Sequence, residues 1–444
     1  GRGGGAPVRK LASLAASPFA GYASLVVLTL VLAGFFIWSD RPLTGPVLTG
    51  EAAASPVTVT LWAQESNDRR QAGLTASVER FNQSQSEIRV VPYFYKEELY
   101  KAKLRVALAS GKMPDLFYTW FGRSFQHNMV ESGRVADLTG WIDRHRELRH
   151  LIVSDALDKA TYEGRIYGIP HSVYHVIVWY NKKMFTEFGL APPVTWDDLM
   201  ETVQVLNKNG VSPIAVAGKE RWPLLNWFAY LSNRIGGNEP FERAVKGEGD
   251  FTDPSFVEAA LKLRELAEKR AFIPGFSGMT WTEAEEAFFA GEAAMYLQGD
   301  WSAEKFMSRQ EIGFFRFPDL GGQGEVTHYY GGYGAGWAIA AGGRVEEALR
   351  VLDFLLNPDE WAGFVASNTA PSPFVNEIVL LSDTPSPVLE YLRYVQTDAT
   401  GYFGYYDQEL DPRRAQLLMD AVLKLVHEPS MTREEIVELL QSVR

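Results

Sequence analysis

Strand-like and helix-like segments alternate along this chain from residue 57 onward, and this alternation limits the possible folds more than any other feature. Residues 57–62 alternate between polar and apolar side chains as a strand does, and a helical pattern follows them. Strands over 88–93 and 116–118 come next, separated by a helix that ends near Gly111. Short links between such elements predict a parallel, doubly wound α/β sheet.

The same alternation returns in the second half of the chain. Helices are predicted to begin at capping boxes formed by Thr195 with Asp198 and by Thr282 with Glu285, and at Asp253, which precedes a proline. With 444 residues the chain is too long for one ordinary hydrophobic core, so two lobes are expected. Further strand-like segments lie at residues 176–180, 214–216, 294–297 and 312–315.

The composition indicates a well-packed body and excludes several classes of function. Hydrophobic residues make up 46% of the chain and aromatic residues 13%, which is typical of a folded protein rather than a disordered one. The net charge is -12 and no basic block stands out, which argues against a nucleic-acid partner. The chain has no cysteine, so disulfides, thiolate metal sites, cysteine nucleophiles and a lipid anchor on cysteine are not expected.

An apolar segment at residues 19–38 predicts a membrane helix. Its length of about twenty residues, at a rise of ~1.5 Å each, matches the roughly 30 Å hydrocarbon core of a bilayer. Basic residues including Arg9 and Lys10 precede it, so residues 1–18 are expected in the cytoplasm and the remainder outside. A cleaved signal peptide is the alternative, although its apolar stretch is usually only ~7–15 residues long. We expect an uncleaved single-pass anchor followed by a linker over 39–56.

Four segments place aromatic and polar side chains together near the ends of strands. In open α/β sheets, ligands bind beyond the carboxyl ends of the strands. A pyranose ring presents an apolar face and a rim of hydroxyl groups, so its host combines indole or phenol rings with carboxylates, amides or arginine. Trp120 and Trp301 are the strongest candidates, because each follows a strand and neighbours a glycine or a carboxylate. The four segments are residues 62–68, 114–123, 299–301 and 328–337.

Other chemistries find weaker support in the sequence. His171 and His175 would face the same side of a strand, but no nearby carboxylate completes a metal site, and none is expected. The glycines of residues 331–336 lack the Lys-Ser/Thr of a phosphate loop, and a strand over 337–341 is expected after them in place of a helix. Paired carboxylates for glycoside hydrolysis stay open, since their separation is a three-dimensional property.

Five stretches in a fixed order carry a joint signal: residues 108–115, 162–170, 179–185, 288–301 and 331–337. Together they resemble the family 1 extracellular solute-binding proteins, the maltose- and multiple-sugar-binding group of ABC importers. The resemblance extends from about residue 57 to residue 444.

This resemblance implies an α/β, two-lobed periplasmic-binding-protein fold of class II type, preceded here by the single N-terminal transmembrane helix. Crossing segments between the lobes would form a hinge on which the lobes close around a ligand. The first lobe would comprise residues 57–170 plus 337–368, and the second 171–336 plus 369–444. The crossings would fall near residues 171–176, 327–336 and 369–373.

The resemblance also implies a binding site with contributions from both lobes. Trp301 would be the stacking ring of the second lobe, and Tyr406 with Asp407 would close the pocket. A rim would be formed by Lys219, Arg221 and Trp222. Trp227 and Trp337 are assigned to packing. The expected ligand contacts are Gln64, Glu65, Trp120, Arg123, Tyr174, Lys219, Trp222, Asp300, Trp301, Gly332, Tyr406 and Asp407.

The function implied by the resemblance is capture of a sugar or short oligosaccharide by aromatic stacking and hydroxyl hydrogen bonding, and its delivery to the permease of an ABC importer. The globular body would lie outside the cytoplasm, in the periplasm or at the cell surface, tethered by the helix. No catalytic residue, cofactor, metal or nucleic acid is expected. The alternatives are a membrane-tethered glycoside-processing enzyme, a solute-sensing module, and glycerol phosphate as the ligand.

Overall fold

The computed structural model describes residues 55–64, 68–152, 154–357, 360 and 387–443. From Pro56 onward they belong to a single unit of internal contacts. The anchor predicted over 19–38 lies outside these ranges. Within them, no helix has the length and apolar character needed to cross a bilayer.

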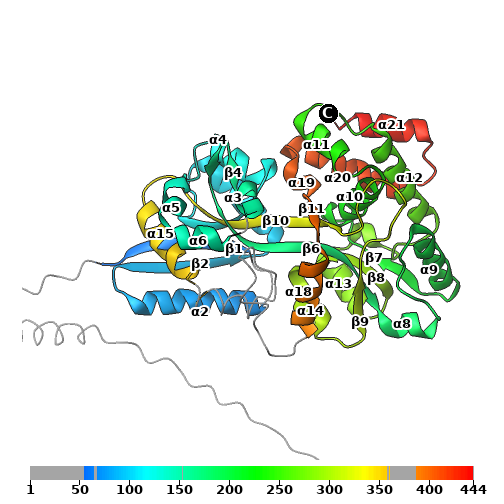
Figure 1. Cartoon of the computed structure of the whole chain (residues 1–444), viewed down its shortest axis with the longest axis horizontal. Helices are drawn as coiled ribbons and strands as arrows, with labels where there is room; N and C mark the ends of the chain where they lie inside the picture. The colour runs from blue at the N-terminus through cyan, green and yellow to red at the C-terminus, as the bar shows by residue number, and fades with distance from the viewer. Residues whose placement is uncertain (1–54, 65–67, 153, 358–359, 361–386, 444) are drawn as a thin grey trace, which may run out of the picture. The chain divides into compact units, whose positions relative to one another are not determined.

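Two long strands connect two α/β lobes. They are β6 (Ile169–Asn181) and β10 (His328–Ile339), which run antiparallel to one another and lie side by side between the two groups of elements (Figure 1). Residues 169–179 of β6 are all buried, as expected for a strand that is covered on both faces. Two of the predicted crossings lie in these strands, whereas the third, over 369–373, lies outside the described residues. The lobe boundaries themselves remain predictions.

The first lobe begins with the alternation seen in the sequence. Its helix α3 ends at Gly111, whose φ of 70° is the left-handed conformation that commonly terminates a helix. The main elements are β1 (Val57–Gln64), α2 (Asp68–Ser84), β2 (Ile88–Tyr95), α3 (Glu97–Ser110) and β3 (Leu116–Trp120). Shorter ones are the π-helical turn η1 (Arg123–His127), α4 (Asn128–Glu131), α5 (Thr139–Arg144), α6 (Arg146–Leu151), α7 (Ser154–Lys159), β4 (Thr161–Tyr162), β5 (Arg165–Ile166) and the later α15 (Val345–Leu355).

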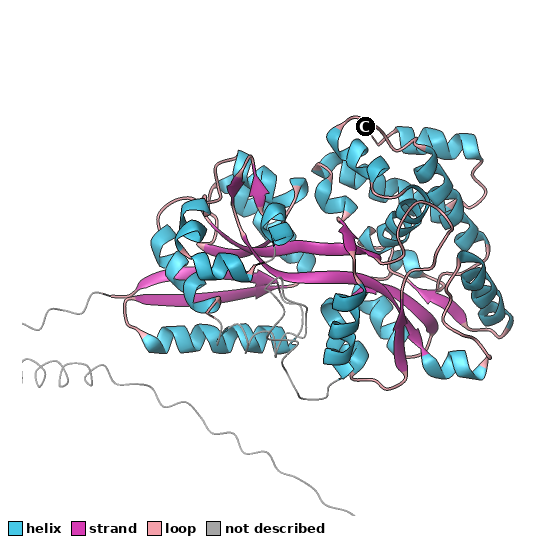
Figure 2. Ribbon diagram, in the orientation of Figure 1, coloured by secondary structure: helices cyan, strands magenta, loops and turns pink. Residues whose placement is uncertain are grey.

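The second lobe is richer in helices, and Figure 2 shows helices above and below its strands. Its strands are β7 (Ser212–Ala215), β8 (Ala293–Gly299), β9 (Ile312–Phe315) and β11 (Gly401–Phe403). Its helices are α8 (Lys182–Glu187), α9 (Trp196–Lys208), α10 (Trp222–Gly236), α11 (Glu239–Lys246), α12 (Pro254–Glu268), α13 (Trp281–Phe289), α14 (Ala303–Met307), α18 (Pro387–Asp398), α19 (Tyr406–Glu409), α20 (Pro412–His427) and α21 (Arg433–Gln441). Its described residues also include the 3-10 turns η2 (Phe276–Gly278) and η3 (Asp300–Ser302).

The nine-stranded sheet mixes parallel and antiparallel pairs, in the order β2-β1-β3-β10-β6-β8-β7 with β11 and β9 attached to β10 and β6. Within the lobes, β1 pairs in parallel with β2 and β3, and β7 with β8. At the centre, β10 is antiparallel to β3 and β6, and β6 is antiparallel to β8. The prediction of a parallel sheet is therefore wrong at the centre, because the chain leaves the first lobe along β6 and returns along β10.

Two of the three predicted helix starts are confirmed, and one is displaced by two residues. Thr195 and Asp198 form a capping box at α9, and the Asp253 side chain accepts a hydrogen bond at the start of α12. At α13 the box is formed by Thr280 with Glu283 rather than by Thr282 with Glu285. Both pairs have the same spacing, so the sequence alone does not separate them. In the fold Glu285 is buried and accepts a hydrogen bond from the Lys305 ammonium group at 2.9 Å.

The glycine-rich stretch at 331–336 lies inside β10, which continues to Ile339, so the strand predicted over 337–341 is confirmed as far as Ile339 and begins earlier than expected. Gly331 has a φ of 139°, and a β-carbon on it would collide with the carbonyl oxygen of Tyr174 in β6. The pairing register shifts between Gly332 and Ala335. Glycine therefore permits both the close approach of the two long strands and the local bulge.

Two hydrophobic clusters stabilise the fold and meet at the sheet of the second lobe. Successive residues of β8 face opposite clusters: Tyr296 belongs to the first, whereas Met295 and Leu297 belong to the second. Trp337 is buried in the first cluster and Trp227 in the second, which confirms the packing role predicted for both. Burial on both faces explains why β8 is apolar along most of its length.

Candidate ligand-binding site

A cavity with about 820 Å³ of space not filled by atoms, part of it open to solvent, lies between the two lobes. The first lobe contributes Gln64, Arg70, Glu97, Lys101, Tyr118, Trp120 and Phe125 to its lining. The long strands β6 and β10 contribute Tyr174, Gly334 and Ala335. The second lobe contributes Trp222, Asn226, Trp281, Trp301, Tyr405, Asp407 and Gln408. The lining therefore combines eight aromatic rings with a smaller set of polar and charged groups.

Three tryptophans dominate the wall formed by the second lobe. Trp222 and Trp281 are the first residues of α10 and α13, and Trp301 stands in η3 directly after β8. The ring centroids of Trp222 and Trp301 are 5.6 Å apart at an interplanar angle of 68°, and Tyr174 meets Trp301 edge-on at 5.9 Å. The Trp301 ring packs over Gly299, where a β-carbon would overlap it. Edge-to-face contacts of this kind hold the aromatic wall in a defined arrangement.

The wall formed by the first lobe pairs aromatic rings with charges. Trp120, the last residue of β3, lies 5.3 Å from Tyr118 and 4.9 Å from Phe125, measured between ring centroids. The ammonium nitrogen of Lys101 is 5.4 Å from the Trp120 ring centre and 2.7 Å from a carboxylate oxygen of Glu97. Lys101 thus makes a cation–π contact with Trp120 of β3, and an ion pair with Glu97, which lies one helical turn earlier in α3.

The formal charges on the cavity wall balance near neutral pH. Arg70 and Lys101 oppose Glu97 and Asp407. Burial by itself would lower the pKa of Lys101, but the carboxylates of Glu97 and Glu98 outweigh it and raise that pKa above its ordinary value. Burial raises the pKa of Asp407 to about 6, against the opposing effect of Lys101. The cavity is therefore suited to a ligand without net charge.

Four buried polar atoms on the cavity wall have no hydrogen-bond partner within the described part of the protein. They are the hydroxyl oxygens of Tyr174 and Tyr405, the indole nitrogen of Trp222 and the amide nitrogen of Asn226. Burial raises the pKa of the Tyr405 phenol well above its usual range, so that this group stays neutral. A buried polar atom without a partner costs about 1–3 kcal/mol, and a polar group that entered the cavity and bonded these atoms would remove that cost.

Six of the twelve predicted contact residues line the cavity. Lys219 lies instead in an adjoining groove, which shares Lys101, Phe125, Trp222 and Asp407 with the cavity. Glu65 lies outside the described residues. The six that line the cavity are Gln64, Trp120, Tyr174, Trp222, Trp301 and Asp407, and their roles in binding remain predictions.

Asp300 does not line the cavity, although its neighbour Trp301 does. Its carboxylate accepts hydrogen bonds from the backbone N–H of His175 at 2.9 Å and from the Tyr391 hydroxyl at 3.1 Å. The Nδ1 atom of His175 is 2.8 Å from its second oxygen. Asp300 is 1% exposed, so its oxygens are occupied in holding β6 to the end of β8.

Tyr406, Gly332 and Arg123 also lie away from the cavity lining. The Tyr406 ring stacks on Phe241 and belongs to the second hydrophobic cluster, and Gly332 lies beneath the ring of Tyr402. Arg123 is exposed and begins the turn η1 directly after Gly122. Of these three, only Tyr406 stands directly beside cavity residues in the sequence, between Tyr405 and Asp407.

The two histidines considered as metal ligands are engaged within β6 and with its neighbours. His175 contacts Asp300 through Nδ1 and the Tyr402 hydroxyl through Nε2 at 3.0 Å. Burial and the charge of Arg70 lower the pKa of His171 to about 3, which keeps that ring neutral. Over the part of the chain that the structure describes, no group of three or more His, Asp or Glu residues is arranged to hold a metal ion.

More than half of the cavity lining was not predicted from the sequence, and two sets of residues show why. Glu97 and Lys101 are one helical turn apart and resemble the solvated face of a helix, so their pattern gave no functional signal. Asn226 follows Trp222 by four residues on α10, and this spacing puts both on one face. That signal was available. The other missed residues are Arg70, Tyr118, Phe125, Trp281, Gly334, Ala335, Tyr405 and Gln408.

Residues 64–360 match the family model of the bacterial extracellular solute-binding proteins. This match covers more than half of the chain, and the protein belongs to that family. The two lobes, the long connecting strands and the cavity between the lobes are consistent with this membership.

Proteins of several organisms are similar to this chain at low identity. A diacetylchitobiose binding protein of Streptomyces coelicolor, DasA, is 24% identical over 335 residues, which cover 71% of this chain and 73% of that protein. The multiple sugar-binding protein of Streptococcus mutans is 24% identical over 223 residues, 48% of this chain and 52% of that one. An uncharacterized ABC transporter extracellular-binding protein of Pyrococcus horikoshii is 26% identical over 216 residues, 47% of each chain. The chain thus spans about half the length of the streptococcal and archaeal relatives.

Solved structures share the fold more completely than these sequences do. A structure from work on xylan utilization by the thermophilic bacterium Caldanaerobius polysaccharolyticus has a TM-score of 0.81 and 26% identity, and covers 87% of this chain and 100% of its own. A chitin oligosaccharide binding protein has a TM-score of 0.77 and 24% identity, with 87% and 98% covered. These likenesses establish the two-lobed α/β fold.

Proposed function

We propose that this protein is the extracytoplasmic substrate-binding protein of an ABC importer, and that its cavity holds a sugar or short oligosaccharide. One observation carries the proposal: an aromatic cavity between two lobes presents buried hydroxyl, amide and indole groups that lack partners within the described protein. A pyranose ring matches this lining, because its C–H face packs on indoles and its hydroxyl groups bond the polar atoms.

The proposal assigns a different task to each type of lining residue. Trp301 and Trp222 stack against the apolar face of a sugar ring, and Trp120 approaches from the opposite lobe. Tyr174 and Asn226 bond hydroxyl groups of the ligand. The balanced charges of the wall favour an uncharged sugar over glycerol phosphate, since a phosphate would need a cationic excess.

Comparison with relatives supports the ligand class in broad terms. The relatives named above include proteins that bind diacetylchitobiose, multiple sugars and chitin oligosaccharides. They differ in the sugar that their names record, so the similarity supports a carbohydrate without choosing one. Membership of a family of binding proteins supports capture rather than catalysis.

We also propose that the apolar segment over 19–38 anchors the protein in the membrane, with the two-lobed body outside the cytoplasm. The partner would be the permease of an ABC importer, which accepts the sugar. Tethering would give the body a high local concentration near that permease, in place of free diffusion.

A thermal-shift screen of the whole chain tests the ligand class. The panel contains diacetylchitobiose, xylotriose, maltotriose and galactose, with glycerol phosphate as the charged comparison. A sugar at ~100 times its Kd adds about 2.7 kcal/mol to the free energy of unfolding, which raises the Tm by several degrees. A shift with glycerol phosphate alone would overturn the proposed ligand class. Chromatography of the incubated oligosaccharide separates binding, which returns it intact, from glycoside processing, which shortens it.

A further inference from the structure

Helix α19 is fixed to the second lobe through Tyr406. The ring of Tyr406 stacks on Phe241 with centroids 3.5 Å apart, and its hydroxyl oxygen is 2.9 Å from that of Ser232. Its backbone N–H donates a hydrogen bond to the Tyr330 hydroxyl at 2.9 Å. Tyr406 is 1% exposed, so these contacts hold the helix firmly to its own lobe.

The same helix also touches the first lobe. The hydroxyl of Ser124 lies within hydrogen-bonding distance of two carbonyl oxygens, 2.7 Å from that of Asp407 and 2.8 Å from that of Leu410. The ammonium group of Lys159, at the end of α7, is 2.6 Å from a carboxylate oxygen of Glu409. Residues 405–410, here called the clasp, therefore bridge the two lobes.

The backbone of the first lobe is shaped to admit the clasp. Gly122 has a φ of 103°, a conformation that side chains rarely allow. A β-carbon at this position would stand 2.6 Å from the carbonyl oxygen of Gln408, so only glycine permits the approach. The clasp contact is thus supported by hydrogen bonds, an ion pair and a close backbone fit.

The clasp carries part of the cavity wall. Tyr405, Asp407 and Gln408 all line the cavity, whereas Ser124 and Lys159 do not. A ligand in the cavity that contacts Tyr405, Asp407 or Gln408 therefore contacts the same segment that joins the two lobes. Because the contacts of Ser124 and Lys159 connect two lobes, separation of the lobes breaks them.

We propose that Ser124 and Lys159 are positioning residues, which set the affinity of the cavity by holding the clasp against the first lobe. This inference rests on the proposed function, because it concerns the affinity for the same ligand. Apparent affinity falls in proportion to the fraction of molecules in the binding-competent state, so contacts that favour the closed arrangement tighten binding without touching the ligand.

The two contacts differ in expected weight. Ser124→Ala removes the hydroxyl that donates to the carbonyl oxygens of Asp407 and Leu410. This change is expected to weaken ligand binding about fivefold. The ion pair of Lys159 with Glu409 is partly exposed, with side-chain exposures of 42% and 26%, so its loss weakens binding only about two- to threefold. Both changes act on the dissociation rate, because the clasp closes after the ligand has entered.

A charge-reversal cycle separates this role from a general loss of stability. Lys159→Glu and Glu409→Lys each bring like charges together, and each is expected to weaken binding about threefold and raise the dissociation rate by the same factor. The double variant restores the pair with its sense reversed and recovers most of the affinity. The probes are diacetylchitobiose, xylotriose and maltotriose. Their binding and dissociation are measured by tryptophan fluorescence in a stopped-flow instrument. Lys112→Glu, an exposed change elsewhere on the first lobe, is the matched control and leaves both constants unchanged.

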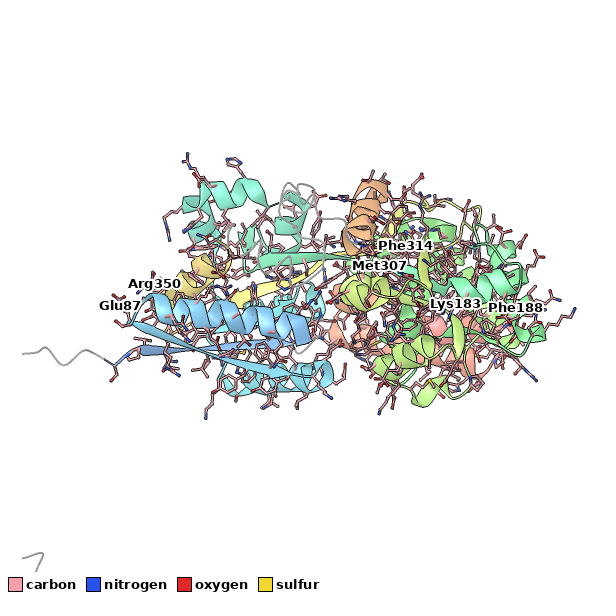
Figure 3. The ribbon with its side chains drawn as sticks, turned by 90° about the horizontal axis from the view of Figure 1, so that it is seen from below. Glu87, Lys183, Phe188, Met307, Phe314 and Arg350 are labelled. Carbon is pink, nitrogen blue, oxygen red and sulfur yellow. The ribbon has the colours of Figure 1, made fainter. Side chains whose placement is uncertain are left out.

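A second measurement needs no sugar. The chain has no cysteine, so single cysteines at Arg350 and Lys183 accept a pair of distance labels cleanly. Figure 3 shows these residues toward opposite ends of the two-lobed body. Lys159→Glu is expected to lower the fraction of molecules with the short distance, and the double reversal to restore it.

The outcomes distinguish the two proposals. If the unaltered protein binds none of the sugars, the proposed ligand class fails, and the label distances still decide the role of the clasp. Suppose that a sugar binds to Ser124→Ala and to Lys159→Glu with the same affinity and dissociation rate as to the unaltered protein. If the label distances of the unaltered and the Lys159→Glu proteins are also the same, the clasp inference is overturned. Weaker binding in both single reversals without recovery in the double variant overturns it as well.

Discussion

The two walls of the cavity differ in chemistry. The wall formed by the second lobe presents three tryptophans, Trp222, Trp281 and Trp301, with the amide of Asn226 beside them. The wall formed by the first lobe presents several charged side chains, of which Lys101 already forms an ion pair within its own helix. Both walls contain polar groups and neighbouring aromatic rings, but the second lobe presents three indoles, whereas the first presents one, Trp120, with the smaller rings of Tyr118 and Phe125.

This difference suggests a division of work in the proposed sugar site. Stacking on indoles buries apolar area and gives most of the binding free energy, whereas charges that are already paired have less to gain from a neutral ligand. The second lobe is then the main contributor to affinity. The first lobe orients the ligand and completes its enclosure.

The sharpest test of this division is Trp301→Ala. Loss of the indole is expected to weaken sugar binding by roughly a hundredfold, about 3 kcal/mol, which is the range of a central aromatic contact. Titration calorimetry measures the affinity, and circular dichroism checks that the fold is kept. Trp301→Phe is the matched control and retains part of the affinity. Unchanged binding in the alanine variant would place the ligand elsewhere.

Trp120→Ala probes the opposite wall with the same chemical change. We expect a smaller loss of about tenfold, since Trp120 is partly engaged by the Lys101 ammonium group and by Phe125. Fluorescence titration against the same sugar gives the comparison. A larger loss of affinity at Trp120 than at Trp301 would show that the first lobe, rather than the second, contributes more to sugar binding.

Tyr174→Phe separates ligand bonding from protein stability. The Tyr174 hydroxyl is buried without a partner in the described protein, so its removal is expected to leave the Tm of the free protein unchanged or slightly raised. Sugar affinity should fall about fivefold, because one hydrogen bond to the ligand is lost. Paired thermal melts with and without sugar measure both effects. A lowered Tm in the free protein, with affinity intact, would show that the hydroxyl serves the fold instead.

Asp407→Asn gives the smallest expected effect, and it depends on pH. Burial raises the pKa of Asp407 to about 6, so ionisation in the folded state is unfavourable. The stabilising contribution of the neutral carboxyl is fully present below the unfolded pKa of about 4 and is lost as the pH rises through the folded pKa. At pH 8 the variant should therefore be more stable by about 1 kcal/mol, after allowance for partial exposure and for the lost attraction to Lys101. Denaturant unfolding from pH 4 to pH 8 measures the gap, and a gap that does not grow with pH would contradict the assignment.

Local sequence patterns were enough to predict most single elements of the fold. Gly111 and Thr195 mark helix ends through side-chain and backbone chemistry that acts within a few residues, and both were identified correctly. The direction of β10 relative to β6 depends on where the chain crosses between lobes, and no local pattern records it. Two overlapping capping boxes at Thr280 and Thr282 likewise look alike until tertiary packing buries Glu285.

The candidate site was harder to predict, because side-chain direction is not written in the sequence. Trp301 faces the cavity, whereas Asp300 beside it is enclosed by hydrogen bonds from β6 and Tyr391. Tyr405 and Tyr406 both belong to the second cluster, but only Tyr405 also lines the cavity. Aromatic residues near strand ends gave a usable signal, but they did not tell which of two neighbours faces the ligand.

Gly299 limits which substitutions the aromatic wall tolerates. It does not line the cavity, yet the Trp301 ring fills the space that any side chain at 299 would need. A change at this glycine would displace the indole as surely as a change at the tryptophan itself. The constraint runs one way: a side chain at 299 fits only if the ring at 301 moves or is lost, whereas a smaller residue at 301 leaves the glycine undisturbed.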